Sequence, residues 1–456
     1  MVSVLHSDPR SFHCGRLLPY AQNTKRRKLI TMESHLLTAG AMTLVFIIGY
    51  IFITIEHYTK INKATIAIMM AILCWVIAFA DGEISSEAHL HHFESGLADV
   101  FQVTFFLFGA LAVVEIIDRH RGFDLITRAI KVQSKKKMLW TISIITFFLS
   151  SILDNLTTTI VMVSLLKKIL DESEERWLIG CAVVIAANAG GAWTPIGDVT
   201  TTMLWIGDRL SAMHIIKGLL FPSLICLLVS VFLFSFRLEG SFTPKAERQV
   251  KTSVEPKGEL IFFLGLGLLI FVPIFKVLTG LPPFMGVLLA LSILWIVTDC
   301  IHSSHEDRDH LRVPYILSKI DLSTVFFFMG ILLCIGALYS EGLLTSLATT
   351  MDKYTSYTWM ALSIGFASAV VDNVPLVAAS MGMYSLEQFP MNHEFWSLVA
   401  YTAGTGGSML IIGSAAGVAL MGMEKINFLW YTKKAFIPAT CGYLAGFLAY
   451  QALSLL

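Results

Sequence analysis

Residues 148–163 read FLSSILDNLTTTIVMV, and residues 366–381 read FASAVVDNVPLVAASM. An Asp-Asn pair interrupts the apolar run in both: Asp154-Asn155 in the first and Asp372-Asn373 in the second. A carboxylate in the hydrocarbon of a bilayer costs at least about 2.5–3.5 kcal/mol, so an intramembrane Asp is a candidate functional residue. Two copies of so costly a feature, 218 residues apart (154 to 372), indicate a duplicated functional element rather than an accident of packing.

The composition places the chain in a membrane. Of its 456 residues, 55% are hydrophobic and only 14% are charged, whereas soluble domains carry about 25% charged residues. The 33 basic residues balance the 33 acidic ones, so the net charge predicts no nucleic-acid partner. The seven cysteines show no CxxC spacing and are interpreted as small core residues rather than as disulfides or metal ligands.

Uninterrupted apolar segments predict eight spans. They lie near residues 36–55, 64–80, 98–117, 212–236, 258–278, 283–300, 322–339 and 430–455. Residues 1–35 are expected to be an N-terminal extension, which carries the basic cluster Lys25–Lys28. Translation is expected to start naturally at Met32, directly before the first span, with a short tolerated tail as the alternative.

Two pairs of short apolar arms meet at the Asp-Asn pairs. The pair over 138–170 has its apex at Asp154, and the pair over 355–390 has its apex at Asp372. Bilayer lipid does not tolerate an irregular polar apex, but a protein cavity at membrane depth does. Each pair is therefore predicted to be a re-entrant helical hairpin, which enters and leaves on one side of the membrane.

The segment after each hairpin is interrupted as well. Residues 188–202 read NAGGAWTPIGDVTTT, and residues 404–417 read GTGGSMLIIGSAAG. Glycine and proline lower helix stability, so 177–206 and 395–423 are predicted to be discontinuous transmembrane helices that are unwound near their centres. Gly190, Gly191 and Gly197 match Gly406, Gly407 and Gly413 at a constant spacing of 216 residues (190 to 406).

Each half thus contains five membrane crossings and one hairpin, giving an all-α polytopic membrane protein with about 10 spans plus 2 hairpins. Because five is odd, the second repeat (258–456) must be inverted relative to the first (36–236), as in secondary transporters. The basic connection 118–137 is expected to be cytoplasmic by the positive-inside bias. The linker 237–257 then also lies in the cytoplasm.

The hairpin tips and broken helices are expected to converge near the midplane. Carboxylate, amide, hydroxyl and carbonyl oxygens suit a hard cation such as Na⁺, and burial raises the pKa of a carboxylic acid above about 3.9. Such an acid can hold a proton until Na⁺ arrives. The candidate Na⁺ and H⁺ ligands are Asp154, Asn155, Thr157, Thr158, Asn188, Asp198, Thr200, Thr201, Asp372, Asn373, Thr405, Ser408 and Ser414.

The two hairpins, together with GGAWTPIGD at 190–198, resemble the NhaD-type sodium/proton antiporters of the ion transporter superfamily over residues 36–456. The resemblance implies a fold like that of the INDY-type dicarboxylate transporters, a multi-pass inner-membrane location and a homodimer. It implies Na⁺ or Li⁺ efflux driven by inward protons, without a cofactor. Family roles carry over onto a first-half set and, less directly, onto Asp372 and the second-half serines. The first-half set is Asp154, Asn155, Asn188, Asp198, Thr200 and Thr201.

Several alternatives remain open. Asp154 and Asp372 are good helix N-cap residues and could serve as caps alone. A sodium-coupled dicarboxylate or other anion transporter could use the same fold, but neither Asp-Asn motif contains Arg or Lys, and the dicarboxylate carriers share Ser-Asn-Thr hairpin tips. The YD and GxGD signature of intramembrane aspartyl proteases is absent, so we expect no enzymatic activity.

Overall fold

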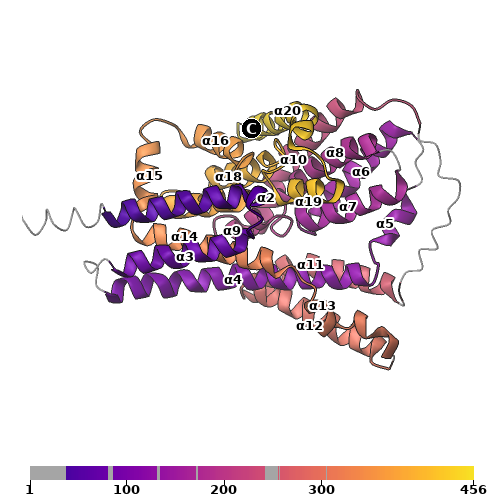
Figure 1. The fold of residues 1–456 in the computed structure, drawn as a ribbon, viewed down its shortest axis with the longest axis horizontal. Helices are drawn as coiled ribbons and strands as arrows, with labels where there is room; N and C mark the ends of the chain where they lie inside the picture. Colours follow the sequence, from indigo (N-terminus) through magenta and orange to yellow (C-terminus); the bar gives the residue numbers. More distant parts are fainter. Residues whose placement is uncertain are drawn as a thin grey trace, which may run out of the picture.

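The computed structural model describes residues 37–80, 86–130, 134–170, 173–241, 255, 257–304 and 306–455. In these ranges the chain is helical, and its β-structure is limited to one isolated bridge between Ser134 and Ser241. Figure 1 shows several long helices, among them those over Lys63–Ala80 and Ser86–Arg119, running along the longest axis of the molecule. The predicted N-terminal extension, 1–35, lies outside the described residues.

Eight described helices are long and apolar enough to span a bilayer, which confirms the eight uninterrupted spans predicted from the sequence. They are the helix over Leu37–Thr54, α3 (Lys63–Ala80), α4 (Ser86–Arg119), α10 (Ala212–Ser235), α11 (Gly258–Thr279), α12 (Pro283–His302), α14 (Leu322–Ser340) and α20 (Phe428–Ser454). The chain is therefore a multi-pass membrane protein.

Several connections between the spans contain short helices. The basic connection 118–137 contains a short helix, α5 (Asp124–Ala129). Other short elements between spans are α2 (Glu56–Thr59), η1 (Glu306–Leu311), α13 (Val313–Leu317) and α15 (Leu343–Met351).

Each Asp-Asn pair separates two helices that are too short to cross a membrane. The first pair is α6 (Lys135–Ser150) and α7 (Asn155–Ile169), of 16 and 15 residues. The second is α16 (Tyr357–Ser368) and α17 (Asn373–Met383), of 12 and 11 residues. A spanning helix needs about 20 residues. Asp154 and Asp372 occupy the N-cap positions of α7 and α17.

The helix after each pair is broken, as predicted. The first consists of α8 (Ser173–Gly191) and α9 (Val199–Ile206). The second consists of α18 (Glu394–Gly406) and α19 (Ala415–Glu424). Gly190 and Gly191 are therefore the last two residues of α8, and the break follows them.

Close packing explains these helical glycines. A Cβ atom on Gly190 would overlap the carbonyl group of Phe147, and a Cβ on Gly406 would overlap the carbonyl group of Gly365. Glycine therefore allows α8 to lie directly against α6, and α18 directly against α16. The breaks that follow bring Asp198 and Ser414 to the N-cap positions of α9 and α19.

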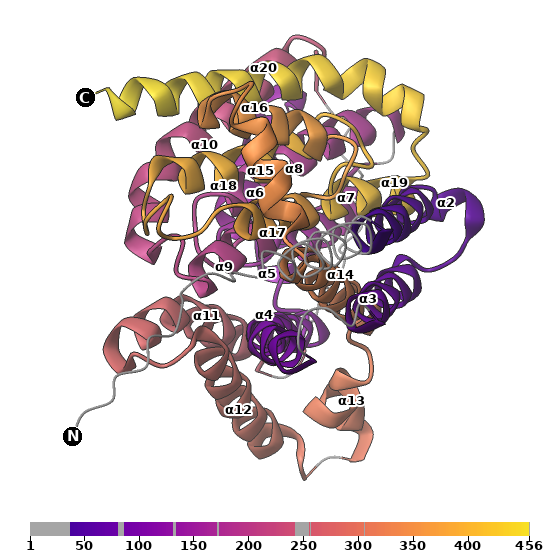
Figure 2. The same ribbon diagram turned by 90° about the vertical axis from the view of Figure 1, so that its left-hand side faces the viewer.

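The same contacts hold both pairs in place. The Ser150 hydroxyl donates to the Ala187 carbonyl over 2.6 Å, and the Ser368 hydroxyl donates to the Ala403 carbonyl over 2.7 Å. In both halves this bond ties the tip of the short pair to the broken helix. In the end-on view of Figure 2, α4, α11 and α12 lie on one side of α9, with α10, α18 and α20 on the other. The polar tips are thus enclosed between two layers of apolar helices.

Candidate functional site

Asp198 lies at the centre of the polar groups that the fold brings together. It caps α9, where its Oδ1 accepts a hydrogen bond from the Thr200 backbone N–H over 3.0 Å. Its Oδ2 accepts from the Asn155 amide over 3.0 Å and from the Asn373 amide over 3.2 Å. The two asparagines begin α7 and α17, so both Asp-Asn tips point at one carboxylate. Asp198 is only 2% exposed.

The side-chain amide of Asn188 extends this arrangement to the other broken helix. The Asn188 oxygen accepts from the Asn155 amide over 3.0 Å. Its nitrogen donates to the hydroxyls of Ser408 and Ser414, over 2.9 and 3.0 Å. We call the connected set the Asp198 network; it consists of Asn155, Asn188, Asp198, Asn373, Ser408 and Ser414. The predicted convergence of the two halves is therefore present for these six residues.

The charge of Asp198 is unbalanced within the part of the chain that the structure describes. Its three hydrogen-bond donors are neutral amides, and none of the ion pairs there includes Asp198. A buried carboxylate without an opposite charge is costly, so such a group binds a proton or a cation, or pairs with one. The network also supplies amide and hydroxyl oxygens, which are ligands that a hard cation accepts.

The predicted threonines other than Thr157 differ in the hydrogen bonds that they make. The hydroxyls of Thr158 and Thr200 are buried without a hydrogen-bond partner among the described residues, as is that of Thr159, which is not among the predicted ligands. Thr201 and Thr405 donate their hydroxyl protons to backbone carbonyls of Asp198 and Tyr401. Thr200 contributes the backbone N–H that holds Asp198.

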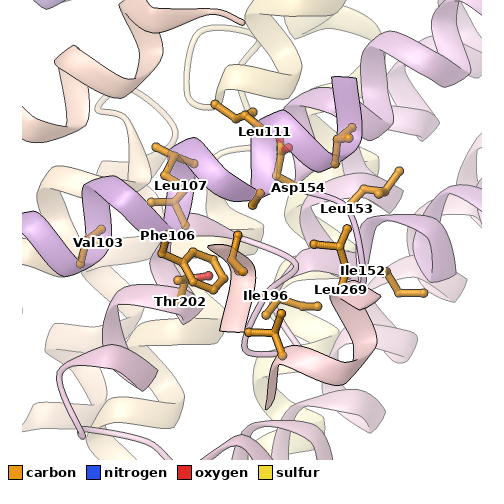
Figure 3. A pocket seen from close by; sticks show the side chains of 15 residues that line it. Val103, Phe106, Leu107, Leu111, Ile152, Leu153, Asp154, Ile196, Thr202 and Leu269 are labelled. Carbon is orange, nitrogen blue, oxygen red and sulfur yellow. The ribbon is translucent and has the colours of Figure 1, made fainter. Parts of the chain in front are cut away.

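Asp154 lies outside the Asp198 network. Its carboxylate accepts hydrogen bonds from the Thr157 backbone N–H over 2.9 Å and from the Thr157 hydroxyl over 2.6 Å. It faces a cavity of about 30 Å³ whose other walls are apolar except for Thr202, as Figure 3 shows. The capping alternative thus describes the geometry of Asp154 in this conformation.

Asp372 differs from both other aspartates. Its side chain makes no capping hydrogen bond to α17. Instead, its Oδ2 lies 3.8 Å from the Lys63 ammonium. The two motifs do not point to Lys63, which lies more than 300 residues before Asp372 in the chain. The available signal was Pro375, which stands where the first tip has Thr157 and which offers neither an N–H nor a hydroxyl to the carboxylate.

Comparisons with known proteins identify the family of this chain. The model of the CitMHS family, described as citrate transporter, matches residues 41–399. Sodium/proton antiporter 1 of Arabidopsis thaliana is 50% identical over 415 residues, which cover 90% of this chain and 72% of that protein. The Na(+)/H(+) antiporter NhaD of Alkalimonas amylolytica is 30% identical over 437 residues, 88% of each chain, and that of Vibrio cholerae is 29% identical. The chain therefore belongs to the CitMHS family and, within it, to the NhaD-type sodium/proton antiporters.

Proposed function

We propose that this protein is a secondary active transporter that extrudes Na⁺, or Li⁺, in exchange for inward protons. The observation that carries the proposal is the buried Asp198 carboxylate, which is held by neutral donors alone. It needs one positive charge, and a proton or a sodium ion can supply it. Relatives named as sodium/proton antiporters support the same activity.

Competition for Asp198 couples the two ions. When Na⁺ binds, the proton must leave, because a second positive charge has no counter-charge in the network. When Na⁺ leaves, the empty carboxylate takes up a proton again. Oxygens of Asn155, Asn188 and Asn373 lie within the network and can complete the coordination of Na⁺. Exchange requires only that this site opens to one side of the membrane at a time.

We propose that alternating access uses the two halves as inverted repeats with re-entrant hairpins. The matching contacts of Ser150 and Ser368 support a common origin of the halves. In Figure 1, α6 and α7 lie toward one end of the long axis, while α15 and α16 lie toward the other. That arrangement is expected if the hairpins open to opposite sides.

Cysteine labelling tests this topology. Single cysteines at Ser134 and Ser173, which flank the first pair, should both react from the cytoplasm in a background without native cysteines. Cysteines at Ser356 and His393, which flank the second pair, should both react from the outside. If the two ends of either pair react from opposite sides, that pair crosses the membrane and the inverted-repeat proposal fails. Light scattering of the purified protein tests the homodimer, which is also part of the proposal.

An anion transporter is the second candidate, since the matched family is described as citrate transporter. The carboxylate at the centre of the Asp198 network disfavours it, because a carboxylate repels an anionic substrate. Proteoliposomes with an acidic interior and an internal pH dye separate the two. External Na⁺ or Li⁺ should make the interior more alkaline, whereas citrate should not. If citrate enters and Na⁺ alone moves no protons, the antiport proposal is wrong.

A further inference from the structure

A cavity with several polar residues in its wall lies beside the Asp198 network. Its volume is about 330 Å³, and it is bounded by the helix over Leu37–Thr54, by α3 and α14, and by α19. We call it the Lys63 cavity; its polar wall consists of Tyr50, Thr54, Glu56, Lys63, Asp372 and Ser414. Ser414 also accepts the hydrogen bond from Asn188. The cavity therefore borders directly on the network in which we place the transported ion.

Lys63 is held in the wall of this cavity by several contacts. It is the first residue of α3, and its backbone N–H donates to the Glu56 carboxylate over 3.1 Å. Its ammonium lies 4.4 Å from the centroid of the Phe327 ring and 3.8 Å from Asp372. Among the described residues that line the cavity, it is the only basic one. The ammonium thus lies between an aromatic face and a carboxylate, both of which attract cations.

The two Asp-Asn tips stabilise their carboxylates in different ways. At the first tip, Thr157 gives Asp154 both its backbone N–H and its hydroxyl. At the corresponding position of the second tip, Pro375 offers neither. Described residues lining the cavity of Asp154 include no basic side chain, whereas Lys63 lies beside Asp372. The ammonium has therefore replaced the hydrogen bonds that threonine provides in the first half.

We infer that Lys63 determines how many sodium ions the protein binds. Its ammonium is the built-in counter-cation of Asp372 and prevents this carboxylate from serving as a second cation site. Each chain then binds one Na⁺, at Asp198, because both oxygens of Asp154 already accept hydrogen bonds from Thr157 and the small cavity that Asp154 faces is apolar except for Thr202. Lys63 acts on the transported ion through Asp372 and is a positioning residue. This inference rests on the proposed sodium exchange.

Counting bound sodium ions tests the inference. Purified wild-type protein should bind one ²²Na⁺ per chain at saturation in equilibrium dialysis. Lys63→Gln removes the counter-cation, so the number should rise to two. The double variant Lys63→Gln/Asp372→Asn should return it to one. Lys60→Gln is the matched control, because Lys60 is exposed three residues earlier and lies outside the cavity wall; it should bind one.

A folded Lys63→Gln protein that still binds one Na⁺ would overturn the inference. Asp372→Asn in the wild-type background gives an independent test if Lys63→Gln does not fold. This variant should still bind one Na⁺, since Asp372 is not a ligand when Lys63 is present; loss of binding would overturn the inference. Wild-type protein that binds no Na⁺ refutes the proposed function and, with it, the inference, whereas one ion in all variants refutes the inference alone.

Discussion

Replacing Asp198 by Asn tests the proposed exchange most directly. The two side chains have nearly the same shape, so the substitution removes the charge and the titrating proton with little change in volume. The expected result is a folded protein that neither binds Na⁺ nor exchanges it for protons.

The hydrogen bonds of Asp198 show how much Asp198→Asn should lower the free energy of unfolding. An Asn oxygen placed at the Oδ2 position keeps the bonds from Asn155 and Asn373. The amide nitrogen then faces the Thr200 N–H, so the bond of 3.0 Å from that group is lost. One such bond contributes about 1 kcal/mol to the free energy of unfolding. Removing a buried charge offsets part of that loss.

The loss of ion binding is much larger. Two unit charges 4 Å apart attract each other by about 4 kcal/mol at an effective dielectric constant of 20. Since about 1.4 kcal/mol is tenfold in affinity, Asp198→Asn should weaken Na⁺ binding roughly 700-fold. Exchange should therefore disappear while the protein stays folded.

Two measurements separate binding from folding. Proteoliposome exchange with a pH dye reports transport, and the rise in unfolding temperature on adding Na⁺ reports binding. Asp208→Asn is the control, because Asp208 follows α9, is 60% exposed and pairs with Lys276 outside the network. If folded Asp198→Asn protein exchanges Na⁺ for protons at the wild-type rate, Asp198 is a structural cap and the proposed coupling is wrong.

Three further predictions concern stability, each measured by thermal unfolding in detergent. Asp154→Ala should lower the free energy of unfolding by about 1 kcal/mol through loss of the α7 cap, whereas Asp154→Asn should retain most of it; equal losses would contradict the capping role. Glu424 is buried and pairs with Arg176 at 2.8 Å, so Glu424→Gln should lower the free energy of unfolding by about 3–5 kcal/mol. Glu174 is exposed and its partner Lys434 lies 3.5 Å away, so Glu174→Gln should lower it by less than about 1 kcal/mol. Burial lowers the pKa of His120, so the charged form of its side chain is disfavoured in the folded protein. The free energy of unfolding should therefore fall as the pH drops below about 6.5, the pKa of histidine in the unfolded chain. An equal dependence on pH in His120→Gln would refute the role of His120.

The sequence alone identified the spans from their apolar segments. It identified the two tips and the broken helices because residues that destabilise an apolar helix mark them. A carboxylate in an apolar run, or glycine and proline inside a span, is destabilising unless it has a role. The spacing of Asp154 and Asp372 showed that the feature is duplicated. The resemblance carried by residues 190–198 led to the family that the comparisons then established.

Only the tertiary structure decided which aspartate lies at the centre and which charges meet. The sequence motif directed attention to Asp154, but the amides of Asn155 and Asn373 converge on Asp198. Lys63 and Asp372 are more than 300 residues apart (63 to 372), and the ion pair depends on how α3 and α17 are placed. The cost of burying a polar group is a property of the local sequence. Its partners are a property of packing between distant segments, which no local pattern records.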